Sequence, residues 1–175
     1  MTALNRTPTS TNFLQPTKYI LSFNRLPTVQ YFCQQANIPG VSIDSAVFPT
    51  PLVDVPLAGN KLSYDEFTVT FIVDEFIQSW NELYKWLLAM GSPKSLEDRV
   101  NYNTLQNSNT SKVSYYSDAN LTVMTALNNP AVRINFHRMF PTNLTSINFD
   151  TGQSADTIIT ATATFRYEYF DITSA

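Results

Sequence analysis

Long runs in which apolar and polar residues alternate constrain the fold of this chain most. In residues 67–73 every odd position is Phe or Val, and two of the three even positions are Thr. In residues 159–169 the odd positions are Ile, Ala, Phe or Tyr, and the even positions are Thr, Arg or Glu. Because side chains alternate between the two faces of a strand, both runs predict strands with one buried face. Neither Pro nor Gly interrupts the second run, so we expect it to be the longest strand.

Helical spacing replaces this alternation after residue 73. Asp74 is placed to cap a helix and Gly91 to end it, which predicts one amphipathic helix of about four turns. We expect Trp80 and Tyr84 to pack against the sheet. The apolar residues at helical spacing are Ile77, Trp80, Leu83, Tyr84, Leu87, Leu88 and Met90.

Shorter alternating runs complete the expected fold. Residues 18–24 and 29–36 predict a strand pair across a turn, and the three prolines of residues 48–56 indicate an edge strand or an extended lip. Gly59, Asn60 and Lys61 predict a turn. Further strands are expected at 41–47, at 142–149, and in a hairpin formed by 121–126 and 131–139. The sum is an α+β fold, mainly antiparallel β: a β-sandwich or small barrel with one flanking amphipathic helix.

The length of 175 residues fits one domain. Residues 1–16 are rich in Thr, Ser, Asn and Pro, which predicts a flexible N-terminal arm followed by a single domain at 17–175. Residues 92–118 are polar and predict a long loop of the kind that binds a partner.

Charge is scarce: 14% of residues are charged, against about 25% in an average soluble domain. Such a surface suits a protein whose faces contact copies of itself, although an ordinary neutral β domain is also compatible with it. The net charge of −3 and the absence of a Lys/Arg block disfavour stable DNA binding, but not a wall past which DNA slides. No apolar run of about 18 residues occurs, so no membrane partner is expected.

The residues needed for common catalytic and metal sites are missing from the sequence. His137 and Cys33 are the only residues of their types, which excludes two-His and Cys-based metal sites. The four glycines form no phosphate-binding loop, and no G-x-S-x-G nucleophile motif occurs. We therefore predict that the chain is not an enzyme and has no catalytic residue, cofactor or metal.

Short motifs that together cover residues 18–170 resemble the T4-like bacteriophage tail tube family. The resemblance rests on Ile38-Pro39-Gly40-Val41, Pro49-Thr50-Pro51, Asp54, Pro56, Gly59-Asn60-Lys61-Leu62, Tyr64-Asp65, Thr70-Phe71, Asp74-Glu75, Trp80, Trp86, Phe140-Pro141-Thr142, Phe149-Asp150 and residues 160–167. It implies a tail-tube fold shared with baseplate tube initiators and the type VI secretion ring protein. In that fold six subunits place their sheets side by side around a channel, the helix packs outside, and loops join stacked rings.

The resemblance also implies roles for particular residues. The expected lumen-facing residues are Thr68, Thr70, Thr160, Thr162, Thr164, Arg166 and Glu168. The expected contacts between subunits or rings are Val41, Ile43, Pro49, Pro51, Asp54, Lys94 and Asn101. Expected partners are sister chains, sheath, baseplate hub and tape-measure proteins, with DNA passing through the lumen without specific binding. The expected location is the virion tail, after assembly in the host cytoplasm.

Two other function classes remain open from the sequence. One is a monomeric β-sandwich module that binds carbohydrate or a host surface, with Tyr115, Tyr116 and Trp86 as an aromatic platform. The other is an enzyme, which would need a cleft with a perturbed acid or base. Size in solution separates the classes, because a binding module stays monomeric while a tube component forms rings.

Overall fold

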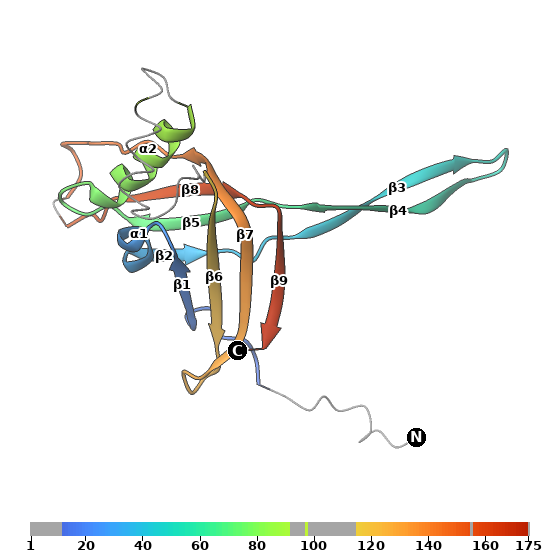
Figure 1. Ribbon diagram of the computed structural model, residues 1–175, viewed down its shortest axis with the longest axis horizontal. Coiled ribbons are helices and arrows are strands. Elements are labelled where there is room, and N and C mark those ends of the chain that lie inside the picture. The colour runs from blue at the N-terminus through green and yellow to red at the C-terminus, as the bar shows by residue number, and fades with distance from the viewer. Residues whose placement is uncertain (1–11, 92–96, 98–114, 155, 175) are drawn as a thin grey trace.

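Two antiparallel sheets that share one long strand, and a hairpin that projects far beyond them, make up the chain (Figure 1). The computed structural model describes residues 12–91, 97, 115–154 and 156–174. In chain order the elements are β1 (Tyr19–Phe23), α1 (Pro27–Tyr31), β2 (Cys33–Ala36), β3 (Val41–Pro49), β4 (Asp54–Tyr64), β5 (Phe67–Ile72), α2 (Gln78–Gly91), β6 (Ser117–Met124), β7 (Pro130–Leu144), β8 (Thr160–Arg166) and β9 (Tyr169–Ser174).

Strand β7 belongs to both sheets. Its first part, residues 130–139, pairs with β6 on one side and, from Val132 to His137, with β9 on the other. Strand β1 pairs with β6, and we call these strands sheet 1. The second part of β7, residues 140–144, pairs with β8, which is followed by β5 and β2; we call these strands sheet 2. In Figure 1 the strands of the two sheets cross each other. The fold is therefore the mainly antiparallel α+β class that the alternating runs predicted.

The change of sheet within β7 takes place at Arg138. This residue has a φ of 52°, a conformation uncommon for residues other than glycine. Its backbone N–H donates to Oδ1 of Asp118 at 3.0 Å, and its guanidinium lies 3.3 Å from Oε2 of Glu168. A bend of this kind lets a strand leave one sheet and join the next at a corner of the sandwich.

Aromatic side chains dominate the core between the sheets. The ring centroids of Phe67 and Phe136 are 4.5 Å apart, and Phe23 contacts Phe165 at 5.4 Å. Helix α2 covers this core through Trp86, whose ring lies 6.4 Å from that of Phe165 and whose Nε1 donates to the Tyr115 carbonyl at 2.9 Å. Within the described part of the chain, no helix is long and apolar enough to cross a membrane.

Helix α2 confirms the predicted position and cap but buries a different face. The Asp74 carboxylate accepts the backbone N–H groups of Gln78 and Ser79 at 3.0 and 2.9 Å, as a cap should. Burial alone would raise the pKa of Asp74, but these hydrogen bonds outweigh it and lower the pKa below its ordinary value. Trp80 packs against the core as expected and is partly buried, whereas Tyr84, also expected there, is 43% exposed. The buried stripe is Ser79, Leu83, Trp86 and Ala89, since small residues let the helix approach the strands closely.

Four other local predictions were wrong. No separate strand spans 142–149, because β7 continues to Leu144 and residues 145–150 are not in a strand. Residues 27–31 form helix α1 instead of a turn and strand, with Pro27 in its first turn and Val29 buried, and β2 pairs with β5 instead of β1. The run 159–169 is not one strand, because β8 joins sheet 2 while β9 joins sheet 1. Gly59, Asn60 and Lys61 form no turn; they lie within β4, and β3 reverses into β4 at residues 50–53.

The sheets do not close on themselves within one chain. Among the described residues, β1, β2 and β9 each pair along one side only. At β1 the N–H of Phe23 donates to Oε1 of Gln30 in α1 at 3.1 Å, which protects that edge. The division into a 1–16 arm and one domain with a 92–118 loop stays a prediction, since residues 1–11, 92–96 and 98–114 lie outside the described part.

Candidate assembly surfaces

The outward face of sheet 2 carries the predicted threonine row. Strands β5 and β8 align Thr68 with Thr164 and Thr70 with Thr162, and the hydroxyl oxygens of the second pair are 3.1 Å apart. The opposite face of these strands is core, since residues such as Val69 and Ala163 are fully buried. The five threonines therefore share the face opposite the core, and their assignment to a lumen stays a prediction.

The two predicted charged members of this row differ in position. Arg166 ends β8 on the threonine face, where its Nη2 lies 3.0 Å from Oε1 of Glu66. Glu168 follows the end of β8, and its N–H donates to the His137 carbonyl at 3.0 Å. Its carboxylate turns to Arg138, so the structure separates Glu168 from the row.

Sequence reasoning missed the residues that widen this face. Gln35 aligns with Thr70, Asn143 aligns with Thr164, and the Thr145 hydroxyl accepts the N–H of Thr162 at 2.8 Å. The alternating pattern around these residues was not recognisable in the sequence, because β2 is short and a proline lies within β7. The resulting surface is rich in hydroxyl and amide groups, and the charges of Arg166 and Glu66 on it compensate each other.

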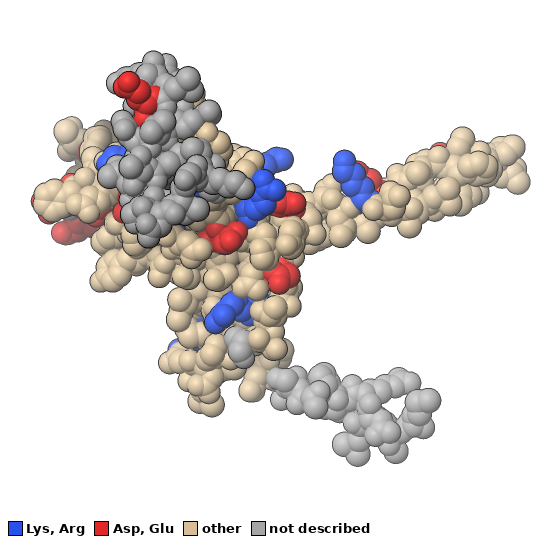
Figure 2. All heavy atoms as spheres, in the orientation of Figure 1, with Lys and Arg blue, Asp and Glu red and all other residues tan. Residues whose placement is uncertain are grey.

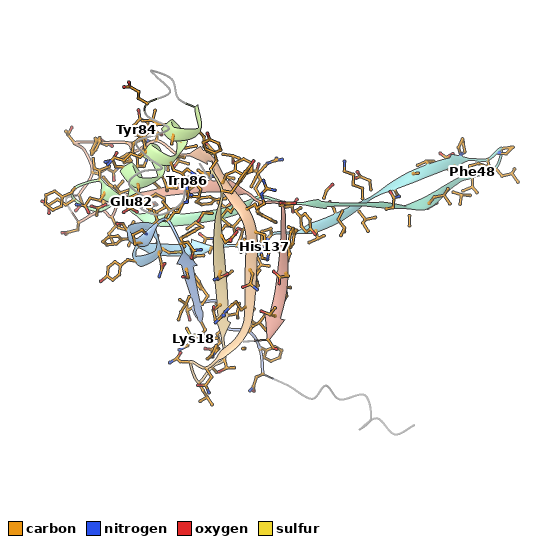
Figure 3. The ribbon with its side chains drawn as sticks, in the orientation of Figure 1. Lys18, Phe48, Glu82, Tyr84, Trp86 and His137 are labelled. Atoms are coloured by element: carbon orange, nitrogen blue, oxygen red, sulfur yellow. The ribbon has the colours of Figure 1, made fainter. Side chains whose placement is uncertain are left out.

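A second surface is the arm, defined as residues 41–64, which comprises β3, β4 and their turn. Figure 3 places Phe48 near its far end, well away from the sandwich. The only charged residues in the arm are Asp44, Asp54 and Lys61, and Figure 2 shows it largely without charge. Nine of its large apolar side chains are exposed, namely Val41, Ile43, Val47, Phe48, Leu52, Val53, Val55, Leu57 and Leu62.

The arm brings together most of the residues predicted to contact neighbours. Val41 and Ile43 lie near its root, while Pro49 and Asp54 are aligned partners next to its turn. Pro51 lies in the turn itself and is exposed. The other two predicted contact residues, Lys94 and Asn101, lie outside the described residues.

The root of the arm is fixed to the sandwich by aromatic contacts. The Tyr64 ring lies 5.6 Å from Phe170 and 5.9 Å from Tyr167, whose hydroxyl donates to the Asp65 carbonyl at 2.9 Å. The N–H of Asp65 in turn donates to the Gly40 carbonyl at 3.0 Å and closes the hairpin base. The arm is thus anchored at its root, while its outer part has no support from its own chain among the described residues.

The outward face of sheet 1 is polar around His137. His137 Nε2 is 2.8 Å from Oδ1 of Asp171, and the His137 ring stacks on Tyr169 with centroids 4.6 Å apart. The hydrogen bond with His137 lowers the pKa of Asp171. His137 is therefore engaged in a strand-to-strand pair between β7 and β9, and Figure 3 shows it on β7.

The remaining ionisable groups give no assembled reactive centre among the described residues. No cluster of three or more His, Cys, Asp or Glu side chains that could hold a metal occurs there. A hollow of about 380 Å³ lies along residues 148–159. Its Asp150 accepts the Gly152 N–H at 2.8 Å, which lowers the pKa of Asp150 and uses the carboxylate to shape its own loop.

The aromatic platform of the binding-module hypothesis does not form as expected. Trp86 is 1% exposed and packs in the core under α2, so it cannot present a ring to a ligand. Tyr116 is exposed, and the Arg138 guanidinium lies 4.6 Å from its ring centre.

Comparisons with known proteins agree with one another. The model of the phage tail tube protein family matches residues 5–173. The tail tube terminator protein of Enterobacteria phage T4 is 27% identical over 167 residues, which cover 92% of this chain and 89% of that protein. The tube-terminating cap of the anti-feeding prophage has a similar fold, with a TM-score of 0.66 and 16% identity over all of both chains. The sheath/tube terminator of the extracellular contractile injection system PVC gives a TM-score of 0.60 and 15% identity, covering 94% of this chain and 99% of that one.

Proposed function

This chain belongs to the phage tail tube protein family, and we propose that it is a structural protein that forms the ring terminating a tail tube. The names of its relatives support this role, since they include the T4 tail tube terminator and two proteins from terminating structures of contractile injection systems. The ring is hexameric and stacks on the tube, so that DNA passes through its centre. The activity of the chain is assembly, and it catalyses no reaction.

The arm is the observation that carries this proposal. Burying the exposed half of one large apolar side chain contributes about 1 kcal/mol, so nine of them contribute about 9 kcal/mol. Association itself costs roughly 4–15 kcal/mol. The arm therefore supplies a large part of what an interface needs, and a monomer that left it in water would carry an aggregation-prone surface. Sister chains are its partner in the proposed ring.

Sheet edges supply the remaining contacts. The unpaired sides of β2 and β9 present backbone N–H and C=O groups that a neighbouring strand can satisfy. Head-to-tail pairing between different edges closes into a ring when the rotation between copies divides a full turn. Val41, Ile43, Pro49, Pro51 and Asp54 are the proposed arm contacts.

The threonine face of sheet 2 is the proposed lumen wall. Thr68, Thr70, Thr160, Thr162 and Thr164 offer hydroxyl groups, and the charged side chains of Arg166 and Glu66 beside them are paired with each other. Without a basic patch such a wall holds no phosphate, so DNA can slide past it. The outward face of sheet 1 is then free for the sheath, baseplate hub or tape-measure proteins of the tail. The protein is expected in the virion tail after assembly in the host cytoplasm.

The molar mass of the purified full-length protein tests the proposal. Light scattering coupled to size exclusion, run over a concentration series, is expected to give a species of six chains. A mass of one chain at every concentration would contradict the proposal and would favour a monomeric binding module.

A further inference from the structure

The arm contains an irregularity that its sequence pattern did not predict. Ile43 aligns with Leu62 and Ser45 with Ala58, so a single β3 residue, Asp44, faces three residues of β4. These three residues, 59–61, include the glycine that the sequence suggested for a turn. The irregularity is therefore a β-bulge with two additional residues in β4, and bulges bend a hairpin and increase its twist.

Gly59 is the residue that permits this bulge. A Cβ atom at Gly59 would lie 2.0 Å from the carbonyl oxygen of Asp44 and 3.0 Å from its carbonyl carbon. Both are backbone atoms, so no side-chain rotation can relieve the clash. Gly59 does not have a positive φ, so glycine is needed here because no side chain fits and not because the backbone conformation is unusual. Any larger residue would separate β3 from β4 at this point.

The bulge divides the arm into parts with different surfaces. On the root side, Val41, Ile43 and their partners form one apolar face, while the aligned pair Ser42 and Ser63 lies on the other. Beyond the bulge lies the outer segment, residues 45–58, which carries exposed apolar side chains on both faces beside the polar Ser45 and Asp54. One face there carries Val47 with Pro56, and the other carries Phe48 with Val55 and Ala46 with Leu57. Water is excluded from both faces only if partner surfaces cover both.

A segment that must be covered on two sides has to leave its own subunit in a defined direction. No described residue of 41–63 belongs to the buried core, so the shape of the bulge has no visible role inside the sandwich. We infer that the Asp44–Gly59 bulge sets the direction in which the outer segment meets sister chains, and that Gly59 is a positioning residue for assembly. This inference rests on the proposed function.

Two glycine-to-alanine variants of the full-length protein test the assembly role. A Cβ at Gly91 would meet no atom of the described residues within 4 Å, so Gly91→Ala is the matched control for Gly59→Ala. We expect Gly59→Ala to keep the circular dichroism spectrum and melting temperature of the wild type. The protein concentration at the midpoint of assembly should rise about ten- to a hundredfold, because the displaced backbone of β3 and β4 changes the direction of the outer segment. Gly91→Ala should assemble like the wild type. Normal assembly by Gly59→Ala, or collapse of its sandwich, would overturn the inference.

A distance measurement separates this inference from the proposed function. Spin labels at Leu52→Cys in the arm turn and Leu127→Cys in the β6–β7 turn, in a Cys33→Ala background, report the direction of the arm within one chain. Leu52 and Leu127 are 97% and 82% exposed, so both tolerate a label. Labelled protein diluted with unlabelled protein should show a shifted or broadened distance distribution on introduction of Gly59→Ala. An unchanged distribution would overturn the inference whether or not the protein assembles, whereas a wild type that never assembles contradicts the proposed function.

Discussion

Replacing Phe48 with alanine removes the bulkiest side chain from the outer segment of the arm. Phe48 is 59% exposed in the single chain, aligns with Val55, and lies far from the sandwich core. The variant should therefore leave the fold of the subunit unchanged. Its effect should be confined to whatever covers the arm.

The exposed area of Phe48 sets the size of the effect. A phenylalanine side chain buries roughly 150–250 Å², so the exposed part of Phe48 amounts to roughly 90–150 Å². At about 25 cal/mol per Å², full burial against a sister chain contributes roughly 2–4 kcal/mol. Alanine keeps part of that area, which leaves a loss of about 2 kcal/mol, or about 30-fold in the dissociation constant of one contact.

Sedimentation velocity over a concentration series measures this loss directly. Leu127→Ala is the matched control, because Leu127 is equally apolar and even more exposed but lies in the β6–β7 turn. We expect the Phe48 variant to dissociate at concentrations where the wild type and the control remain assembled. Equal assembly by all three proteins would refute the claim that the arm is an interface.

Three further changes test other parts of the account. Thr162→Trp narrows the proposed lumen, so virions carrying it should contain normal rings but deliver DNA poorly; unchanged infectivity together with normal rings would refute the lumen assignment. Asp74→Ala removes the cap of α2 and should cost about 1 kcal/mol at pH 7, or a melting temperature lower by about 2–4 °C. Folding lowers the pKa of Asp74, so the cap stabilises the protein at pH values above the ordinary pKa of about 3.9. This stabilisation is lost as the pH falls through the lower pKa of the folded state, and the melting temperatures of variant and wild type should converge there. A difference in melting temperature that stayed constant with pH would contradict this cause. Burial raises the pKa of the Cys33 thiol, so alkylation of the native protein at pH 8 should be much slower than after unfolding, and equal rates would contradict that environment.

Period-two patterns predicted most of the strands and the shared face of the threonines, because burial of one face of a strand makes apolar and polar residues alternate. The cap at Asp74 was also predictable, since a carboxylate just before a helical run has a well-defined chemical role. The buried face of α2 was not predictable from apolar spacing alone. Ser79 and Ala89 are buried because the helix lies close to the strands, and only the packed structure reveals that distance.

Features that depend on pairing between distant segments escaped prediction. The alternation of residues 159–169 continues through Tyr167 and Glu168, although the chain moves there from sheet 2 to sheet 1. The change of sheet in β7 occurs at Arg138, a residue type with no preference for positive φ. Gly59 and its neighbours carry the composition of a turn, but the space they require is set by the opposite strand. In each case the cause lies in a partner far along the chain.

A cryo-electron microscopy reconstruction of the assembled protein would show how the subunits are arranged around the hole. We expect a closed six-membered ring in which Thr70 and Thr162 face the central hole and both faces of the outer arm segment are covered by sister chains. Particles of single subunits, or a ring in which the arms project into solvent and α2 lines the hole, would contradict this expectation.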